Sequence, residues 1–461
     1  MSRAVVKVSK LTRPTPQPSA HRRRPAGKPA RFAASAGLLL VATLQSPPAH
    51  GQPTAPAEAP ATMAWTWRGE ARLIGQMARA RAAGPLHQAG RWQPALDPGA
   101  PDTATAALEL QGQAGPATAN LLLAQGEASP GTGTTTARFN ELQLSGEWGG
   151  WQWSAGKKVV SWDVGYGFRP NDVVAQEARR LLLTTTPEGR PLLQAEWFGS
   201  DDALSLVWVQ PQHAGQPADR QRGAEESALA ARAYHRDGAT DWHGVARWGE
   251  HTGASLGLAS VWVATDELAL HASARWLQRH DGWAGPGPAG PLLWRRNPWQ
   301  MSTLGPTRQW LLGAQWTGAD RLSLLAEAWH DGSAPSDGQW RAWQRRNQAL
   351  TRLASRPGVP AGVPQAAAGN LAWQATPLAG AGPRQDNVFL RLAWQPDPWQ
   401  WTLDTLWQPA DGGRIVTAGL TWQGDRWRAQ VSARHLGGPL QALMAQLPVR
   451  HQVLASLLLA F

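Results

Sequence analysis

The sequence predicts an all-β fold, a transmembrane antiparallel β-barrel of about 18 strands, with about 16 strands as the alternative. Three observations favour this fold: strand-like alternation from residue 64 to the end, an asymmetry between short and long connections, and an apolar final strand. A soluble β-sandwich gives no reason for that asymmetry to persist along the chain, whereas a barrel that crosses a bilayer does.

The predicted strands are runs of about eight to eleven residues in which polar side chains alternate with Leu, Val, Ala and Trp. Alternation turns one face of each strand toward lipid and the other toward the lumen. The expected strands cover 64–74, 106–114, 117–126, 138–147, 150–160, 191–198, 202–210, 227–236, 241–248, 254–264, 267–276, 309–317, 321–330, 387–395, 399–408, 413–423, 426–435 and 448–461.

The connections predict how the barrel lies in the membrane. Every second junction is a tight turn rich in Gly, Asp and Pro, which is the chemistry that closes hairpins. The alternate junctions hold long inserts, and outer-membrane barrels have short periplasmic turns and long extracellular loops. The tight turns are 149–150, 199–201, 237–240, 265–266, 318–320, 396–398 and 424–425, and the long inserts are 75–105, 161–190, 211–226, 277–308 and 331–386.

The chain ends on HQVLASLLLAF, in which every second residue from Val453 to Leu459 is apolar and the last residue is Phe461. We expect the apolar face to contact lipid and this strand to close the barrel against the strand near 64–74. The closing strand then runs from the outside inward, so we expect both chain termini of the barrel to lie in the periplasm.

The N-terminal segment predicts export. Residues 1–31 carry nine Lys and Arg and no acid, and FAASAGLLLVATL follows at 32–44 with small Ala49 and Gly51 where a signal peptidase would cut. The apolar stretch is too short for a membrane span of roughly 20 residues. We therefore expect a signal peptide at 1–51, a periplasmic leader at 52–63 and an outer-membrane barrel at 64–461.

The charge and cysteine content narrow the function classes. Nine of the positive charges belong to the signal, so they account for all but about two of the formal net charge of +11, and nucleic acid is not an expected partner. The chain has no cysteine, so no disulfide framework stabilises it.

Tryptophan dominates the aromatic residues, with 28 Trp against 2 Tyr and 6 Phe. Most tryptophans cluster at predicted strand ends, and an indole suits the boundary between hydrocarbon and headgroups. Tryptophans within the long inserts have two open interpretations, loop cores or platforms for sugars. Those residues are Trp294, Trp299, Trp340 and Trp343.

Arginine outnumbers carboxylate on the predicted inward faces. Two interpretations remain open: cross-strand pairing that stiffens the wall, and a positive corridor that favours anionic solutes. The inward residues include Arg232, Arg247, Arg275, Arg321, Arg391, Arg428 and Arg434, with Glu141, Glu196, Glu327 and Asp404 as the acids.

The segment 154–191 is unusual in composition. Lys157 and Lys158 are the lysines of the mature chain, and because neighbours in a strand face opposite sides, we expect a bulge or a locally covered face there. The loop that follows has mixed charge, and residues 173–183 could form a short helix. Folded into the lumen, it would set the constriction; an ordinary external loop is the alternative. Its charged candidates are Asp163, Arg169, Asp172, Arg179 and Arg180.

The stretch GKKVVSWDVGYGFRPND resembles the strand-to-loop motif of Gram-negative outer-membrane porins and polysaccharide-export barrels, including the alginate-export type. Asp163 stands where that pattern often has Gly. The terminal Phe461 is similar to the signal that the barrel-assembly machinery reads. The resemblance implies a channel in the outer membrane of a Gram-negative bacterium, with outer-membrane lipid and the assembly machinery as partners.

The function hypothesis is porin-like or export-like passage of a polar, possibly anionic, solute or polymer. The alternative is a plugged barrel that acts as a scaffold or surface-assembly protein through the 331–386 insert, in which 355–386 is expected to be mobile. Catalysis is not expected, since the sequence holds no GxSxG, HExxH or phosphate-cradling loop, and no cofactor or metal is expected. The oligomeric state is left open. The lumen or constriction candidates are Lys157, Lys158, Asp163, Arg169, Asp172, Arg179, Arg180, Arg232, Arg247, Arg275, Arg321, Arg391, Arg428 and Arg434, and the assembly candidate is Phe461.

Overall fold

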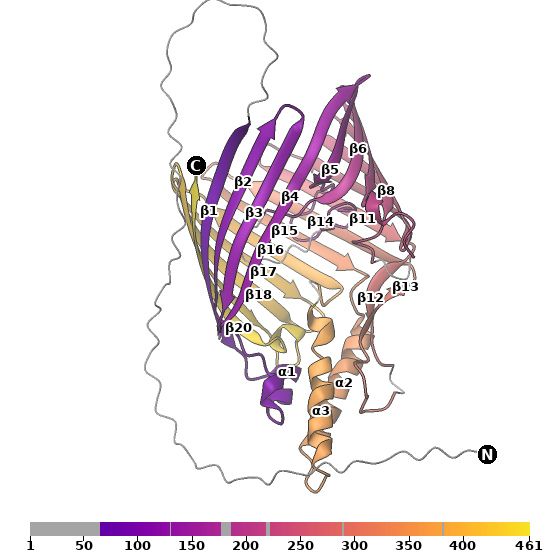
Figure 1. Ribbon diagram of the computed structural model, residues 1–461, viewed down its shortest axis with the longest axis vertical. Helices are drawn as coiled ribbons and strands as arrows, with labels where there is room; N and C mark the ends of the chain where they lie inside the picture. The colour runs from indigo at the N-terminus through magenta and orange to yellow at the C-terminus, as the bar shows by residue number, and fades with distance from the viewer. Residues whose placement is uncertain (1–64, 130, 177–185, 218–221, 288–289, 380–381) are drawn as a thin grey trace, which may run out of the picture. The chain divides into compact units, whose positions relative to one another are not determined.

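The computed structural model describes residues 65–461 except 130, 177–185, 218–221, 288–289 and 380–381. Within this part of the chain, 18 antiparallel strands pair in sequence order, and β20 pairs with β1 to close the barrel (Figure 1). The predicted fold class is confirmed. The predicted signal peptide at 1–51 and leader at 52–63 lie outside the described residues.

Each predicted strand corresponds to one barrel strand. The main differences are that β1 continues six residues past the predicted end at 74 and that β4 begins six residues before 138, in a Thr-rich run that favours extended backbone. The barrel strands are β1 (Thr66–Ala80), β2 (Thr103–Ala114), β3 (Ala117–Ala128), β4 (Thr132–Trp148), β5 (Trp151–Lys158), β6 (Arg190–Phe198), β7 (Asp202–Val209), β8 (Ala228–Asp237), β9 (Thr240–Gly249), β10 (Gly253–Val263), β11 (Leu268–Leu277), β14 (Thr307–Thr317), β15 (Leu322–Asp331), β16 (Asp386–Trp394), β17 (Trp399–Gln408), β18 (Gly413–Gln423), β19 (Trp427–Gly437) and β20 (Val449–Ala460).

Short turns gather at one end of the barrel and long connections at the other. In Figure 1 the C-terminus lies at the short-turn end at the top, and the helices lie at the long-loop end below. The predicted asymmetry is therefore confirmed. No helix among the described residues is long and apolar enough to cross a membrane.

The seam between β1 and β20 closes at the last residue. The backbone N–H of Phe461 donates to Gly69 O at 2.9 Å, and the N–H of Gly69 donates to Phe461 O at 2.8 Å. A Cβ on Gly69 would lie 2.5 Å from the Phe461 ring, so the absent side chain makes room for that ring. Trp67 covers Gly112 on the neighbouring strand in the same way.

The outward face of the barrel is apolar. Leu73, Leu229 and Leu258 are 61%, 60% and 70% exposed, and the strand pairing turns them away from the lumen. Side chains of this kind would be costly in water over such an area, so the surface fits a bilayer. Exposed tryptophans on the same surface near strand ends include Trp148, Trp153, Trp242, Trp248, Trp394, Trp399, Trp401 and Trp427.

The long connections carry ordered structure that alternation does not predict. Residues 355–386, expected to be mobile, contain the helix α3. Its alanine-rich sequence favours a helix, and α3 packs on α2 in one apolar cluster. Trp299, Trp340 and Trp343 form a second cluster, so these tryptophans are loop cores. The added elements are α1 (Gly84–Gly90), β12 (His280–Ala284), β13 (Gln300–Leu304), α2 (Asp337–Ala354) and α3 (Gly362–Trp373), with short 3-10 turns at Pro94–Leu96, Pro211–His213, Thr376–Ala379 and Leu443–Ala445.

We predict that Gly156→Ala destabilises the barrel by about 1–3 kcal/mol. Gly156 has φ +131°, and a Cβ there would lie 2.3 Å from the backbone oxygen of Leu142. The measurement is the temperature at which the folded, faster-migrating gel band is lost. Gly75→Ala is the matched control, since nothing lies within 4 Å of its Cβ position. Equal transition temperatures for the two variants would contradict the prediction.

Candidate functional site

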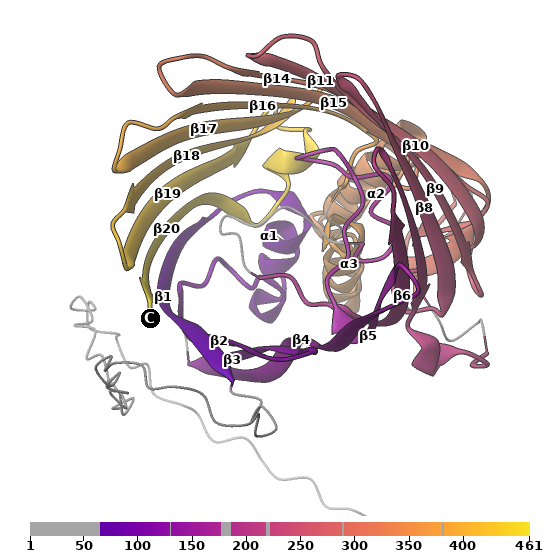
Figure 2. The ribbon, with the colours of Figure 1, turned by 90° about the horizontal axis from the view of Figure 1, so that it is seen from above.

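The connection between β5 and β6, residues 159–189, enters the barrel instead of extending outside it. We call it the inner loop, and its described parts are 159–176 and 186–189. Viewed from above, it runs inside the ring of strands (Figure 2). The described part of the predicted helix at 173–183, residues 173–176, is a turn, and Arg179 and Arg180 lie outside the described residues.

The inner loop begins on an apolar patch of the wall. Val160, Trp162, Val173 and Val174 pack against inward residues of β6–β9. Those wall residues are Leu192, Val207, Val209, Ala228, Ala230 and Val245. The inward face of these strands is therefore a small hydrophobic core rather than a polar lumen surface, because the loop covers it.

The middle of the inner loop is fixed to β10 and β11. The Asn171 amide donates to Ser273 Oγ at 2.9 Å and to Leu258 O at 3.1 Å. Arg275 donates to Pro170 O at 3.1 Å and to Ser255 Oγ at 2.9 Å. The candidate Arg275 therefore holds the loop in place instead of facing a solute.

The tip of the inner loop is held by one buried carboxylate. The backbone N–H groups of Tyr166 and Gly167 donate to the two Glu327 oxygens at 2.7 and 2.6 Å. His271 Nε2 lies 2.9 Å from Glu327 Oε1, and the Glu327 side chain is fully buried. Hydrogen bonds to an ionised group are among the stronger ones, so Glu327 is the main polar anchor of the tip.

Aromatic stacking supports the same tip. The Phe168 ring stacks on Trp329 and the Tyr166 ring on Phe389, each pair with centroids 5.7 Å apart. Arg391 donates to the Tyr166 hydroxyl at 2.6 Å. The loop thus spans the inner wall from β5 to β16.

Asp163, an acid of the inner loop, binds the loop's own backbone. Asp163 accepts the N–H of Val164 at 2.8 Å and that of Asn171 at 2.5 Å. Burial raises the pKa of Asp163, although these hydrogen bonds oppose the shift. Asp172 is 4% exposed, and Arg169 donates to Gly165 O and Ser161 Oγ. These charges shape the loop, so we assign them no direct contact with a solute.

Arginines remain on the wall beyond the loop tip, on β16 to β19. Arg391 pairs with Asp404 at 3.2 Å across neighbouring strands. Arg434 donates to Thr417 Oγ1 at 3.1 Å, and the strand register places Arg428 on the same inward face. Asp404 is the one carboxylate among the inward residues of these four strands, so this stretch, which we call the arginine wall, is positive.

Two other candidates have local partners. Lys157 lies on the outward side, where its ammonium group binds Glu188, while Lys158 turns inward and donates to Ser154 Oγ at 3.2 Å. The hydrogen bond from Lys157, with the nearby charge of Arg138, lowers the pKa of Glu188. The expectation of a covered face is confirmed.

Two further candidates, Arg321 and Arg232, each lie against another side chain. Arg321 is in the turn before β15, where its φ is +59° and it pairs with Asp397 at 2.9 Å, so its predicted place on the wall is wrong. Arg232 turns inward on β8, and its guanidinium lies 5.7 Å from the centroid of the Tyr234 ring.

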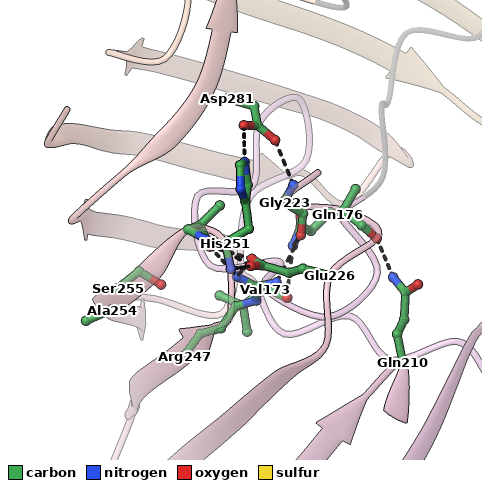
Figure 3. Close-up of polar contacts among 12 residues, drawn as sticks. Val173, Gln176, Gln210, Gly223, Glu226, Arg247, His251, Ala254, Ser255 and Asp281 are labelled. Atoms are coloured by element: carbon green, nitrogen blue, oxygen red, sulfur yellow. Dashed lines mark hydrogen bonds and ion pairs between the residues drawn. The ribbon is translucent and has the colours of Figure 1, made fainter. Parts of the chain in front are cut away.

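Arg247 belongs to a buried polar cluster that sequence reasoning missed (Figure 3). Arg247 pairs with Glu226 at 2.7 Å and donates to Gly223 O at 2.9 Å. His251 Nε2 lies 2.8 Å from Asp281 Oδ1, and the Gly223 N–H donates to Asp281 Oδ2 at 2.7 Å. We call these five residues the latch. They come from the connection between β7 and β8, from β9, from the turn after it and from β12, so no local motif announces them.

No family model and no curated protein matches the chain. Its structure neighbours are bacterial outer-membrane porins. A mutant of the Rh. blastica porin shares 10% identity at a TM-score of 0.39, covering 86% of this chain and 100% of that one. Pseudomonas aeruginosa OccK8 (OprE) shares 9% at 0.49, covering 86% and 97%, and Acinetobacter baumannii OccAB1 shares 8% at 0.48, covering 86% and 96%. The fold itself rests on the strand pairing described above.

We predict that Glu327→Gln loosens the tip of the inner loop while the barrel still folds. A neutral amide offers one acceptor oxygen to two backbone donors, and each bond to the charged group contributes about 1.5–3 kcal/mol. In planar bilayers we expect a higher mean conductance and more open-channel noise. Glu196→Gln is the control, because Glu196 is an inward carboxylate bound to Ser205 Oγ at 2.8 Å on the next strand. Identical current traces for both variants would contradict this role.

Proposed function

We propose that the chain is a channel of the Gram-negative outer membrane that passes polar solutes, with a preference for anions. The single observation that carries the proposal is the arginine wall, where Arg391, Arg428 and Arg434 share an inward surface with one acid, Asp404. The inner loop packs on β6 to β9, on the other side of the lumen. Its tip reaches the arginine wall, where Arg391 donates to the Tyr166 hydroxyl.

Physical chemistry favours anions at such a surface. Arginine keeps its charge at any physiological pH, and its planar fork binds carboxylate and phosphate with two parallel hydrogen bonds. A polar path enclosed by low-dielectric walls also focuses the field of fixed charges on a passing ion. The pair between Arg391 and Asp404 cancels one charge, which leaves the positive charges of Arg434 and Arg428 in excess.

The location in the outer membrane is supported by the closed barrel and its apolar outward face. The basic, then apolar N-terminal segment and the terminal Phe461 fit export and delivery to the barrel-assembly machinery, and both assignments stay proposals. Passage of a polysaccharide is a narrower form of the same proposal. Its support is the resemblance of GKKVVSWDVGYGFRPND to the strand-to-loop motif of polysaccharide-export barrels.

A second candidate is a closed barrel that acts as a surface-assembly partner. The helices α1, α2 and α3 favour it, since they lie within the outline of the ring when the barrel is viewed along its axis (Figure 2). Conductance separates the two functions: a folded barrel without ion current, with a partner that co-purifies stoichiometrically, would favour the closed barrel.

We predict that the triple variant Arg391→Gln, Arg428→Gln, Arg434→Gln shifts the reversal potential in a salt gradient toward cations. We expect the anion-to-cation permeability ratio to fall by several-fold, because fixed charge at a narrow site sets ion preference. Asp404→Asn should shift the potential in the opposite direction.

The matched control removes three exposed outward arginines, as Arg79→Gln, Arg308→Gln, Arg414→Gln, and should keep the original selectivity. The absence of any ion current in the unaltered protein, or an equal shift in the control, would contradict the proposal.

A further inference from the structure

The helix α2 has two faces of opposite character. Its buried face carries Trp340, Trp343, Asn347, Leu350 and Ala354. The exposed face carries three arginines separated by four and seven residues, a spacing that keeps them in one row along a helix, and a fourth exposed arginine follows two residues after the helix ends. They are Arg341, Arg345, Arg352 and Arg356, and we call them the arginine row.

The arginine row has no compensating acid. Over the part of the chain that the structure describes, none of its four guanidinium groups makes a hydrogen bond or an ion pair. Asp337, the acid of α2, pairs instead with Arg384 at 2.7 Å. Arg346 on the same helix behaves differently, since it donates to Pro291 O and Leu292 O at 3.0 and 2.6 Å.

The fold does not need these charges. Like charges four residues apart repel and destabilise a helix, and Arg341 and Arg345 form such a pair within α2. The helix is held from its other side: Trp340 donates to Pro383 O at 2.6 Å, Trp343 to Gln374 O at 2.8 Å, and Ser336 forms a capping box with Gln339. A row that opposes the stability of its own helix indicates a binding role.

The arginine row lies at the long-loop entrance of the barrel. Figure 1 shows α2 beyond the strand ends, and Figure 2 shows it inside the outline of the ring. Gln344 donates to Gln441 O at 2.7 Å, and Thr351 bonds to Gln88, so α2 is tied to loops from other sectors of the wall. Exposed Arg295 and Arg296, in the loop that Arg346 holds, add positive charge nearby.

The spacing of the charges selects the ligand. At 1.5 Å per residue, Arg341 and Arg352 are about 16 Å apart along the helix, and Arg356 follows just beyond its end, so a small anion contacts one arginine whereas an extended polymer contacts the whole row. The guanidinium fork suits repeated carboxylates. The row therefore fits a linear chain with charges along its length.

The surroundings of the row argue against other polyanions. The exposed large apolar side chains of the described residues include none from α2, and Leu440, beside Gln441, is one such side chain nearby, so the row itself gives a protein partner no anchor and nucleic-acid bases no aromatic stacking surface. A lipid surface lies outside the ring of strands, away from α2. We propose that the arginine row is a docking surface for an acidic polysaccharide at the outer entrance. Docking there does not require passage through the lumen.

The test measures binding of polygalacturonate to the folded full chain in detergent by titration calorimetry, with neutral dextran as the comparison polymer. We expect binding to the acidic polymer that weakens with salt, and much weaker binding of the trisaccharide. The variant Arg341→Gln, Arg345→Gln, Arg352→Gln, Arg356→Gln should bind on the order of tenfold more weakly or worse.

The matched control removes four other exposed arginines from the same end of the barrel, as Arg79→Gln, Arg308→Gln, Arg414→Gln, Arg450→Gln, and should stay within about twofold of the unaltered protein. No binding by the unaltered protein, equal binding of dextran, or equal losses in the two variants would overturn the inference. Bilayer conductance of the same preparations tests the channel separately: conduction without polymer binding contradicts the docking surface alone, and polymer binding without conduction contradicts the channel alone.

Discussion

The hydrogen-bonded seam between β1 and β20 is the constraint on which the rest of the structure depends. A strand edge in a bilayer would leave backbone donors and acceptors without partners, and closure removes both edges at once. The register at that seam also decides which residues of the closing strand face inward, because a slip of one residue would exchange the two faces of the strand that slips. The paired N–H and C=O groups of Gly69 and Phe461 fix the register at the end of the chain.

The inner loop divides the lumen into two chemically different halves. On β6 to β9 it turns the wall into a hydrophobic core, and Glu327 and Arg275 are used to hold it there. On β16 to β19 the arginines keep access to the lumen. Both interpretations of the inward arginines therefore apply, each to its own part of the wall: Arg247 and Arg275 are structural, whereas Arg428 and Arg434 leave positive charge on the open side.

The strands and their orientation could be predicted because alternation and turn chemistry are local properties of the chain. Prediction failed where distant segments meet. The inward faces of β7 and β9 carry Val207 and Val245, which alternation alone does not explain, because the loop that covers them comes from elsewhere in the sequence. The sequence does hold a local signal for α2, the Ser336 and Gln339 capping box. The alternation that predicts strands does not reveal it. The latch carried none, because residues far apart in the sequence, on strands and on connections, form it.

Gly223 has a consequence for how the barrel responds to force at its surface. Its N–H binds the carboxylate of Asp281 in the β12 hairpin, and its carbonyl accepts from Arg247 on β9 and from Gln176 of the inner loop at 3.2 Å. One residue thus joins the β12 hairpin, the wall and the inner loop. A load applied to the exterior reaches the interior through this junction, so the loops outside the barrel and the loop inside it behave as parts of one mechanical linkage.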